Sequence, residues 1–328
     1  MRKVRVAAIQ PAVNSLPTHY QYGTSEYTPD VDGILAEFVL PQAEVTFEML
    51  EKAGETGLDI ITTCEDLSYA STFIFDVSPN SVFPQLVNKS YPIVEERLAS
   101  IAKKHNMNIV ACYFKPFEGK IYNTASVFDR NGKIIGDYKK THLPSFEFFG
   151  AVEGDSIHTI DVDFGKIGIM ICYDMMFPAV SQVLSTLGAE IVFHPTFGYG
   201  WNDSIGGATL RTRANDGSFF LVTAKNYVPN GAGNSCVIDP WGTVLVDAGH
   251  DANIFIRHEI DLDKPKMHPE RIIHTVITGE PNMRIRAASE SRPELYGDLC
   301  KRIAPKYSLP PSDTHAFVNK MFKDGYHW

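Results

Sequence analysis

The first group that could perform chemistry is a cysteine at the end of a short apolar run. Residues 167–171 read Ile-Gly-Ile-Met-Ile, which is typical of a buried strand, and Cys172 follows them directly. Pro178 suits the first turn of a helix, where its missing N–H has no partner to lose. A strand, a turn at Cys172 and a helix predict part of a parallel or mixed α/β sheet. Ligand crevices in such sheets lie at the carboxyl ends of the strands.

Two further side chains of catalytic types follow other predicted strands. Glu65 comes after the apolar segment 58–63, and Lys140 comes after the predicted strand 133–138, within Tyr-Lys-Lys-Thr-His-Leu. A thiolate is a nucleophile, a carboxylate can move protons, and an ammonium can stabilise an oxyanion. Each residue is commonplace alone, whereas the three together meet the needs of attack on an amide carbonyl.

In this order and with these neighbours, Glu65, Lys140 and Cys172 resemble the Glu-Lys-Cys triad of the nitrilase, or carbon–nitrogen hydrolase, superfamily. The opening strand Val-Ala-Ala-Ile-Gln, the hairpin Ser-Cys-Val-Ile-Asp-Pro-Trp-Gly and the tail Arg-Pro-Glu-Leu-Tyr are also similar to the family, so the resemblance spans residues 4 to about 297. It implies an α/β fold of the αββα-sandwich type. It also implies that two such subunits associate, with one sandwich stacked on the other. It further implies hydrolysis of an amide, urea or nitrile through a covalent thioester or thioimidate.

The resemblance also implies roles for individual residues. Cys172 would be the nucleophile, and Glu65 the general base that later acts as general acid. Lys140 would face the tetrahedral oxyanion together with the backbone N–H of Tyr173. Glu147 resembles the second glutamate that many amidases and carbamoylases of the family carry beside the triad. The alternative for Glu147 is an exposed acid in an aromatic loop.

Four other positions near these residues matter for the comparison. His142 raises the alternative of a Cys-His dyad, whereas the family's histidine at this place is structural. His194 is interpreted as a hydrogen-bonded histidine at a strand end. The family usually has Pro where this chain has Cys64, and Glu where it has Ala179. Both differences leave the triad intact but separate the chain from the well-defined branches.

The residues after the nucleophile indicate the branch of the superfamily. Tyr173 and Asp174 follow Cys172, whereas nitrile-hydrolysing members typically have Trp-Glu there, so the chain resembles amidases and carbamoylases. Met175 and Met176 stand where carbamoyl-amino-acid hydrolases often place an arginine. We therefore expect hydrolysis of an amide to a carboxylic acid and ammonia. Hydrolysis of N-carbamoyl substrates, acyl transfer to an amine and a non-catalytic binding protein remain alternatives.

The expected pocket wall is mainly aromatic and apolar, which suits an uncharged acyl group. It comprises Tyr69, Phe146, Phe148, Phe149, Tyr173, Met176, Phe197 and Trp201. Three cations, Arg211, Arg213 and Lys225, follow later and could reach a substrate carboxylate.

Composition restricts the class of protein. Of the 328 residues 44% are hydrophobic and 21% charged, which is ordinary for a globular domain. The net charge of −9 argues against nucleic-acid binding, and no apolar run is long enough to span a bilayer. The five cysteines are scattered without a Cys-x-x-Cys pair, so we expect no metal, no disulfide framework and a reducing cytoplasm. The implied reaction needs no cofactor, and because a strand is predicted directly after Met-Arg-Lys we expect no signal peptide.

Apolar periodicity and turn residues predict the order of elements. The strands are expected at 4–9, 58–63, 108–114, 122–128, 133–138, 157–162, 166–172, 191–193, 219–224, 235–239, 243–246 and 254–260, and the helices at 41–57, 91–105, 178–187 and 208–216. Residues 14–32 read as a long loop, for which a cover over the site and a solvated insertion are the alternatives.

The chain is expected to divide into a hydrolase domain, residues 1–263, and a C-terminal extension, residues 264–328, that crosses onto a neighbouring subunit. The helical stripe of Val180, Val183, Leu184 and Leu187 is assigned to the internal sheet, which leaves Met176 and Phe177 as the nearest partner-facing residues. We therefore expect a homodimer or larger oligomer.

Overall fold

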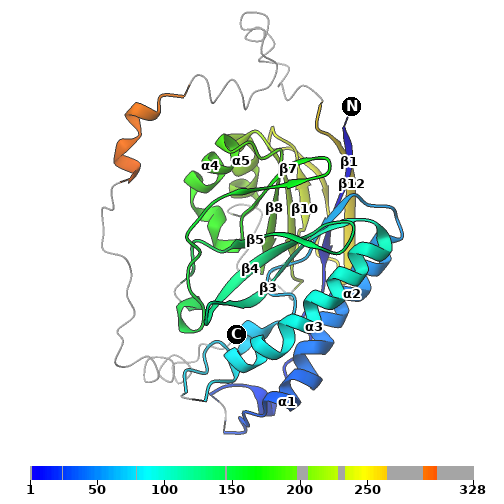
Figure 1. Ribbon diagram of the computed structural model, residues 1–328, viewed down its shortest axis with the longest axis vertical. Coiled ribbons are helices and arrows are strands. Elements are labelled where there is room, and N and C mark those ends of the chain that lie inside the picture. The colour runs from blue at the N-terminus through cyan, green and yellow to red at the C-terminus, as the bar shows by residue number, and fades with distance from the viewer. Residues whose placement is uncertain are drawn as a thin grey trace, which may run out of the picture.

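The fold is seen in a computed structural model, which describes residues 2–23, 25–78, 80–144, 146–197, 206–227, 233–263 and 291–300. Two six-stranded sheets run in the orders β12-β1-β2-β3-β4-β5 and β11-β10-β9-β8-β7-β6 (Figure 1). The strands are β1 (Lys3–Gln10), β2 (Ile60–Thr62), β3 (Asn108–Phe117), β4 (Lys120–Phe128), β5 (Ile134–Lys139), β6 (Thr159–Val162), β7 (Gly165–Ile169), β8 (Ile191–Thr196), β9 (Phe220–Lys225), β10 (Cys236–Ile238), β11 (Val244–Asp247) and β12 (Ile254–Asp261). The helices are α1 (Val31–Ile34), α2 (Leu40–Gly54), α3 (Val82–His105), α4 (Pro178–Thr186) and α5 (Ala208–Gly217). A π-helical stretch, Leu35–Val39, joins α1 to α2, and short 3₁₀ turns occupy Thr18–Tyr20, Ala70–Phe73, Glu147–Phe149, Cys172–Met176, Pro293–Leu295 and Gly297–Cys300.

Both sheets follow one plan, in which three parallel strands lie beside antiparallel ones. β1, β2 and β3 are parallel and so are β7, β8 and β9, whereas β4, β5, β6, β10, β11 and β12 join through antiparallel pairs. The parallel strands are mostly apolar because both of their faces are covered, although Lys3 and Arg5 at the start of β1 are exposed. The carboxyl ends of β2, β7 and β8 thus carry Glu65, Cys172 and Phe197 toward one region.

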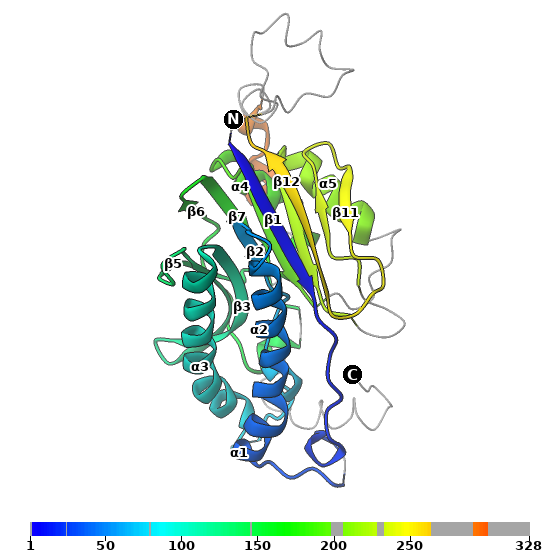
Figure 2. The same cartoon turned by 90° about the vertical axis from the view of Figure 1, so that its right-hand side faces the viewer.

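The layers form an αββα sandwich, as the sequence predicts. Helices α2 and α3 cover the outer face of the first sheet, and α4 and α5 cover that of the second (Figure 2). The main core lies between the sheets, where Val6 and Ile60 of the first sheet share a cluster with Ile169 and Phe193 of the second. In the part of the chain that is described, no helix is both long and apolar enough to cross a membrane.

A second apolar cluster extends the molecule beyond the sheets and abuts the candidate site. It joins Tyr20 of the 14–32 loop to Phe38, Phe73 and Phe83. The loop packs against this cluster, and the hydroxyl of Tyr27 donates to Asp76 at 3.0 Å. The described residues of the 14–32 loop therefore lie beside the second apolar cluster, and none of them lines the pocket described below.

Helix α3 is longer than the sequence analysis predicts. It begins at Val82 and not at Tyr91, and it runs through Pro92. Proline is normally a sign of a helix start, because it lacks an N–H and clashes with the preceding turn. Pro92 lies on the exposed face of α3, where the carbonyl freed by its ring can bind water.

The stripe on α4 also differs from the prediction. Val180 and Leu184 are buried against the second sheet, but Val183 is 39% and Leu187 43% exposed. A nine-residue helix on a flat sheet buries one row of residues spaced four apart, which here is Val180 and Leu184. Neighbouring positions such as Val183 turn outward. Most of the predicted extension, residues 264–290 and 301–328, lies outside the described residues, so its assignment stays a prediction.

Candidate active site

Cys172 stands in a sharp turn between β7 and α4. Its backbone has φ of 45°, in the left-handed region that non-glycine residues rarely adopt, and such strain concentrates at functional sites. His194 supports the turn from beneath. Its Nε2 lies 3.1 Å from the carbonyl oxygen of Cys172, and its Nδ1 lies 2.9 Å from Thr223 Oγ1. Burial lowers the pKa of His194 to about 4, so the neutral ring donates to the Cys172 carbonyl.

A buried carboxylate, Asp174, joins this turn to the segment that carries Lys140. It accepts hydrogen bonds from the backbone of Ile171 at 2.9 Å and of His142 at 3.0 Å, and from the hydroxyl of Tyr138 at 2.8 Å. The His142 ring also faces Asp174, with Nδ1 2.9 Å from Oδ1. The Cys-His dyad therefore finds no support, because the contacts of His142 lie with Asp174.

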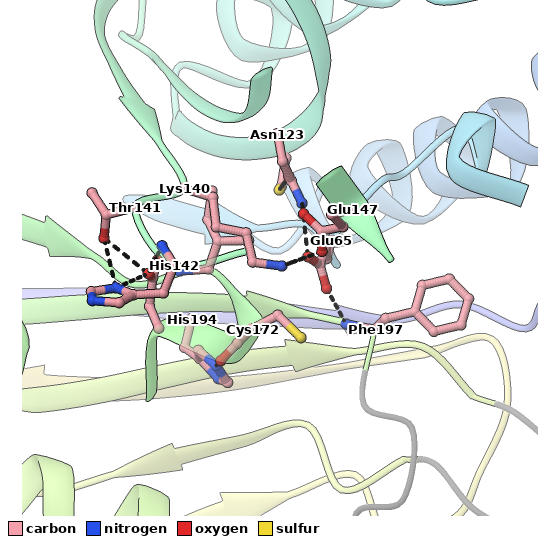
Figure 3. A network of polar contacts seen from close by, with 12 residues as sticks. Glu65, Asn123, Lys140, Thr141, His142, Glu147, Cys172, His194 and Phe197 are labelled. Atoms are coloured by element: carbon pink, nitrogen blue, oxygen red, sulfur yellow. Dashed lines mark hydrogen bonds and ion pairs between the residues drawn. The ribbon is translucent and has the colours of Figure 1, made fainter. Parts of the chain in front are cut away.

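Lys140 lies between two glutamates and has no solvent exposure (Figure 3). Its Nζ is 2.7 Å from Glu65 Oε1 and also contacts Glu147 Oε1. The amide nitrogen of Asn123 donates to both carboxylates, at 2.8 Å to Glu65 and 3.3 Å to Glu147. The backbone N–H of Phe197 holds the other oxygen of Glu65 at 2.9 Å. The structure thus brings together the four predicted catalytic residues, which are Glu65, Lys140, Glu147 and Cys172. Glu147 is buried and is not an exposed loop acid.

One ammonium serves two carboxylates, and their pKa values separate accordingly. Burial opposes ionisation of Glu65, but Lys140 and hydrogen bonds, one of them from the Cys172 thiol, outweigh it and lower the pKa of Glu65. Burial and the nearby charge of Glu65 raise the pKa of Glu147 to about 7 despite Lys140. Burial would lower the pKa of Lys140, yet the two glutamates raise it well above its usual value.

The thiol itself is protonated at rest. The side chain of Cys172 is partly exposed to solvent. The surrounding protein nevertheless desolvates its thiolate, and this desolvation together with the charge of Glu65 raises the pKa of the thiol to about 12. The ionised Glu65 acts on this thiol through its charge and lines the same pocket, so it is placed to take the proton. The pair can therefore form a thiolate when the nucleophile attacks, without one being present beforehand.

A pocket of about 340 Å³ opens over these groups. It is lined by Glu65, Asp66, Ser71, Thr72, Phe75, Phe114, Asn123, Pro144, Phe146, Glu147, Cys172, Tyr173, Met175, Met176, Thr196 and Phe197. Phe146, Tyr173, Met176 and Phe197 are where the sequence analysis expects them.

Tyr69 does not line this pocket, in contrast to the prediction. It is buried, and its ring packs edge-on against Phe197 with centroids 5.1 Å apart. Phe148 and Phe149 likewise pack on the second cluster and not on the pocket wall. Trp201 lies outside the described residues.

The sequence analysis missed several residues of the wall. Phe75 and Phe114 belong to apolar segments that read as core, and nothing in their spacing marks them as pocket residues. Asn123 sits within a strand without a local signal.

The three cationic residues that were expected to reach a substrate carboxylate do not line the pocket. Arg211 donates to the carbonyl of Gly242 at 2.8 Å, and Arg213 donates to that of Met175 at 2.8 Å. Lys225 is buried at the end of β9. None of the three is among the described residues that line the pocket.

Comparison with known proteins identifies the family. The carbon–nitrogen hydrolase family matches residues 72–265. The chain belongs to this family. Omega-amidase NIT2 of Mus musculus is 28% identical over 237 residues, which are 66% of this chain and 81% of that protein.

Solved structures agree on the fold. A carbon–nitrogen hydrolase from Helicobacter pylori has 23% identity and a TM-score of 0.71, covering 92% of this chain and 99% of its own. An amidase from Nesterenkonia sp. has 20% identity and a TM-score of 0.63, covering 83% of this chain and 96% of its own. The αββα sandwich is thus the architecture of this carbon–nitrogen hydrolase. Among its described residues, no group of three or more His, Cys, Asp or Glu side chains is arranged to hold a metal ion.

Proposed function

We propose that this carbon–nitrogen hydrolase cleaves linear amides to a carboxylic acid and ammonia through a thioester on Cys172. The observation that carries the proposal is that Cys172 and Glu65 line one pocket, with the Nζ of the buried Lys140 2.7 Å from Glu65 Oε1. A nucleophile, a proton acceptor and a fixed positive charge thus meet at one end of a pocket.

The geometry supports a reaction in two halves. The sulfur of Cys172 attacks the amide carbon while its proton passes to Glu65, and Lys140 and the backbone N–H of Tyr173 stabilise the oxyanion. Glu65 then protonates the leaving nitrogen, the C–N bond breaks, and ammonia departs from the thioester. A water molecule attacks next and gives a proton to Glu65. Collapse of that second intermediate breaks the C–S bond, and the proton returns to the thiol.

Glu147 acts through Lys140 in this scheme. Its carboxylate contacts Lys140 and is itself held by Asn123, which also donates to Glu65. Two carboxylates fix the ammonium in one place, which preorganises its charge for the oxyanion. Glu147 is therefore proposed as a positioning residue for Lys140.

The wall of the pocket favours an acyl group that carries no carboxylate. Phe75, Phe146 and Phe197 supply apolar surface, and the described wall has no Lys or Arg that could pair with a carboxylate. We expect uncharged aliphatic or aromatic amides to have a higher kcat/KM than dicarboxylic monoamides or N-carbamoyl amino acids.

A panel of matched substrates, followed by ammonia release, measures this order. Carbon dioxide release from N-carbamoyl substrates is followed in parallel, because it distinguishes a carbamoylase from an amidase. If kcat/KM is at least tenfold higher for the carboxylate-bearing substrates, which corresponds to about 1.4 kcal/mol of transition-state binding, the apolar-pocket hypothesis is wrong.

The exposed apolar face beside the pocket supports a homodimer. Met176 is 47%, Val183 39% and Leu187 43% exposed, and they belong to the turn before α4, to α4 and to its C-terminal cap. Apolar patches of this kind mark interaction surfaces. We expect light scattering at micromolar concentration to give a dimer or larger assembly.

Charged substitutions locate that interface. Val183→Asp with Leu187→Asp should weaken the dimer at least tenfold, because an aspartate would be buried without a partner. Ile93→Asp is the control, since Ile93 is 45% exposed on α3 at the other side of the molecule. A monomeric wild type, or an equal effect of Ile93→Asp, would rule out this face.

A further inference from the structure

The described wall of the pocket carries acidic side chains and no basic ones. Glu65, Asp66 and Glu147 line it, whereas no Lys, Arg or His does so among the described residues. Lys140 is not among the lining residues and contacts both Glu65 and Glu147. One positive charge therefore faces three acidic groups, and the pocket is electronegative.

Asp66 is the acidic group that the proposed reaction does not use. It is 1% exposed, with a backbone φ of 48°, a left-handed conformation that aspartate tolerates better than most residues. Its Oδ2 accepts from the backbone N–H of Ser71 at 2.8 Å, and its Oδ1 lies 3.4 Å from Ser68 Oγ. Burial raises its pKa to about 6, which leaves it mostly ionised at pH 7.5.

The charge of Asp66 is not neutralised within the described part of the chain. Its hydrogen bonds come from neutral groups, and no described Lys, Arg or His forms an ion pair with it. The undescribed segments that follow β8 and β9, residues 198–205 and 228–232, contain no Lys, Arg or His in their sequence. Among the described residues the charge of Asp66 is thus uncompensated, and in a site of low dielectric such a charge acts strongly on whatever enters the pocket.

The remaining wall suits a cation as well. Four phenylalanines line the pocket, Phe75, Phe114, Phe146 and Phe197. The face of an aromatic ring attracts an ammonium group, and a carboxylate within reach adds to that attraction. The same carboxylate repels an anionic substrate.

We propose that Asp66 is a specificity-determining residue that makes this site select amides whose acyl chain carries a protonated amine. The inference rests on the proposed amidase function and names its substrate class. For amides of equal length, it predicts that kcat/KM is highest for amine-bearing substrates, lower for neutral ones and lowest for carboxylate-bearing ones.

Three matched amides test the order in the wild-type chain at pH 7.5. They are 4-aminobutanamide, pentanamide and glutaric acid monoamide, which differ in the terminal group and bear a positive, zero and negative charge. We expect kcat/KM for ammonia release to fall by about tenfold at each step, as one charge in a partly desolvated site would cause. These wild-type ratios do not depend on the folding of any variant.

Asp66→Asn then assigns the effect to this residue. Asparagine keeps an oxygen for the Ser71 N–H and tolerates the left-handed backbone, but it carries no charge. The ratio of 4-aminobutanamide to pentanamide should fall about tenfold, and the ratio of glutaric acid monoamide to pentanamide should rise. Asp161→Asn removes an equal charge from an 80% exposed side chain on β6 and should leave both ratios unchanged.

Failure of this inference and failure of the proposed function give different results. If pentanamide is cleaved but glutaric acid monoamide is cleaved equally well, the inference is wrong and the amidase stands. Unchanged ratios in Asp66→Asn also overturn it. If the wild type releases ammonia from none of the three amides, the proposed function fails and the inference fails with it.

Discussion

Cys172→Ala should abolish ammonia release, with kcat/KM reduced by at least about 10⁴-fold, while the chain keeps its fold. Removal of the nucleophile from a catalytic set leaves only the residual effect of binding and oxyanion stabilisation. Cys172 lines the pocket and packs against the main core, and alanine keeps the β-carbon of that contact. Initial rates with pentanamide and circular dichroism of the purified variant measure the two parts of this expectation.

Cys236→Ala is the matched control for this substitution. Cys236 is a buried thiol on β10, outside the pocket that contains Cys172, and its replacement should leave the rate within a few-fold of wild type. Turnover that survives Cys172→Ala would remove the thioester scheme.

Alkylation distinguishes an enzyme from a protein that only binds. In the proposed mechanism Glu65 takes up the thiol proton, so iodoacetamide at neutral pH should label Cys172 faster than the other four cysteines. Glu65→Gln should slow that labelling, since an amide cannot take up the proton. Equal labelling of all five thiols would favour the non-catalytic alternative, in which Cys172 is inert.

The central part of the site follows from the sequence because it depends on topology. Glu65 and Cys172 each come after a parallel strand, and parallel strands end at the same edge of their sheet. Lys140 comes after β5, which pairs with β4 in the first sheet. Apolar runs and turn residues locate these strand ends, and the resemblance of the three residues to the family's triad is what predicts that they meet.

The pocket wall depends on backbone details that the sequence does not signal. Asp66 and Tyr69 both have left-handed backbones, although neither is a glycine or an asparagine. Those two turns direct residues 66–75 so that Tyr69 packs behind Phe197 and Phe75 enters the wall. A list of aromatic residues near the nucleophile cannot distinguish these two outcomes.

The exposed face of α4 shows a related limit. Apolar residues at helical spacing predict a buried stripe, but the width of that stripe depends on what packs against the helix. Here the second sheet buries Val180 and Leu184 and leaves Val183 and Leu187 outside. The sequence contains the apolar residues of both faces, and only the packing separates them.

Lys140→Met should remove activity and also destabilise the folded chain. The rate should fall by about 10²–10³-fold or more, since the positive charge facing the oxyanion is lost. The free energy of unfolding should fall by about 3–5 kcal/mol at pH 8, because Glu65 and Glu147 would then be buried beside each other without a cation. Urea unfolding of the wild type and the variant measures this loss.

The pH dependence of that loss has a definite sign. Without Lys140, the pKa values of both glutamates in the folded variant should rise above those in the unfolded chain. Such groups destabilise the fold at high pH, and the penalty is relieved as pH falls and they take up protons. The difference in unfolding free energy between wild type and Lys140→Met should therefore be smaller at pH 5 than at pH 8.

Lys139→Met separates this effect from the general loss of a lysine. Adjacent residues at a strand end point to opposite faces, and the Nζ of Lys139 lies 3.5 Å from the centroid of the Phe117 ring. Loss of that contact should cost no more than about 1 kcal/mol, with little change in rate and no dependence on pH between 5 and 8. If the two variants lose equal stability, or if the deficit of Lys140→Met does not shrink at pH 5, then Lys140 does not neutralise the buried glutamates. The proposed stabilisation of the oxyanion would then need another source of charge.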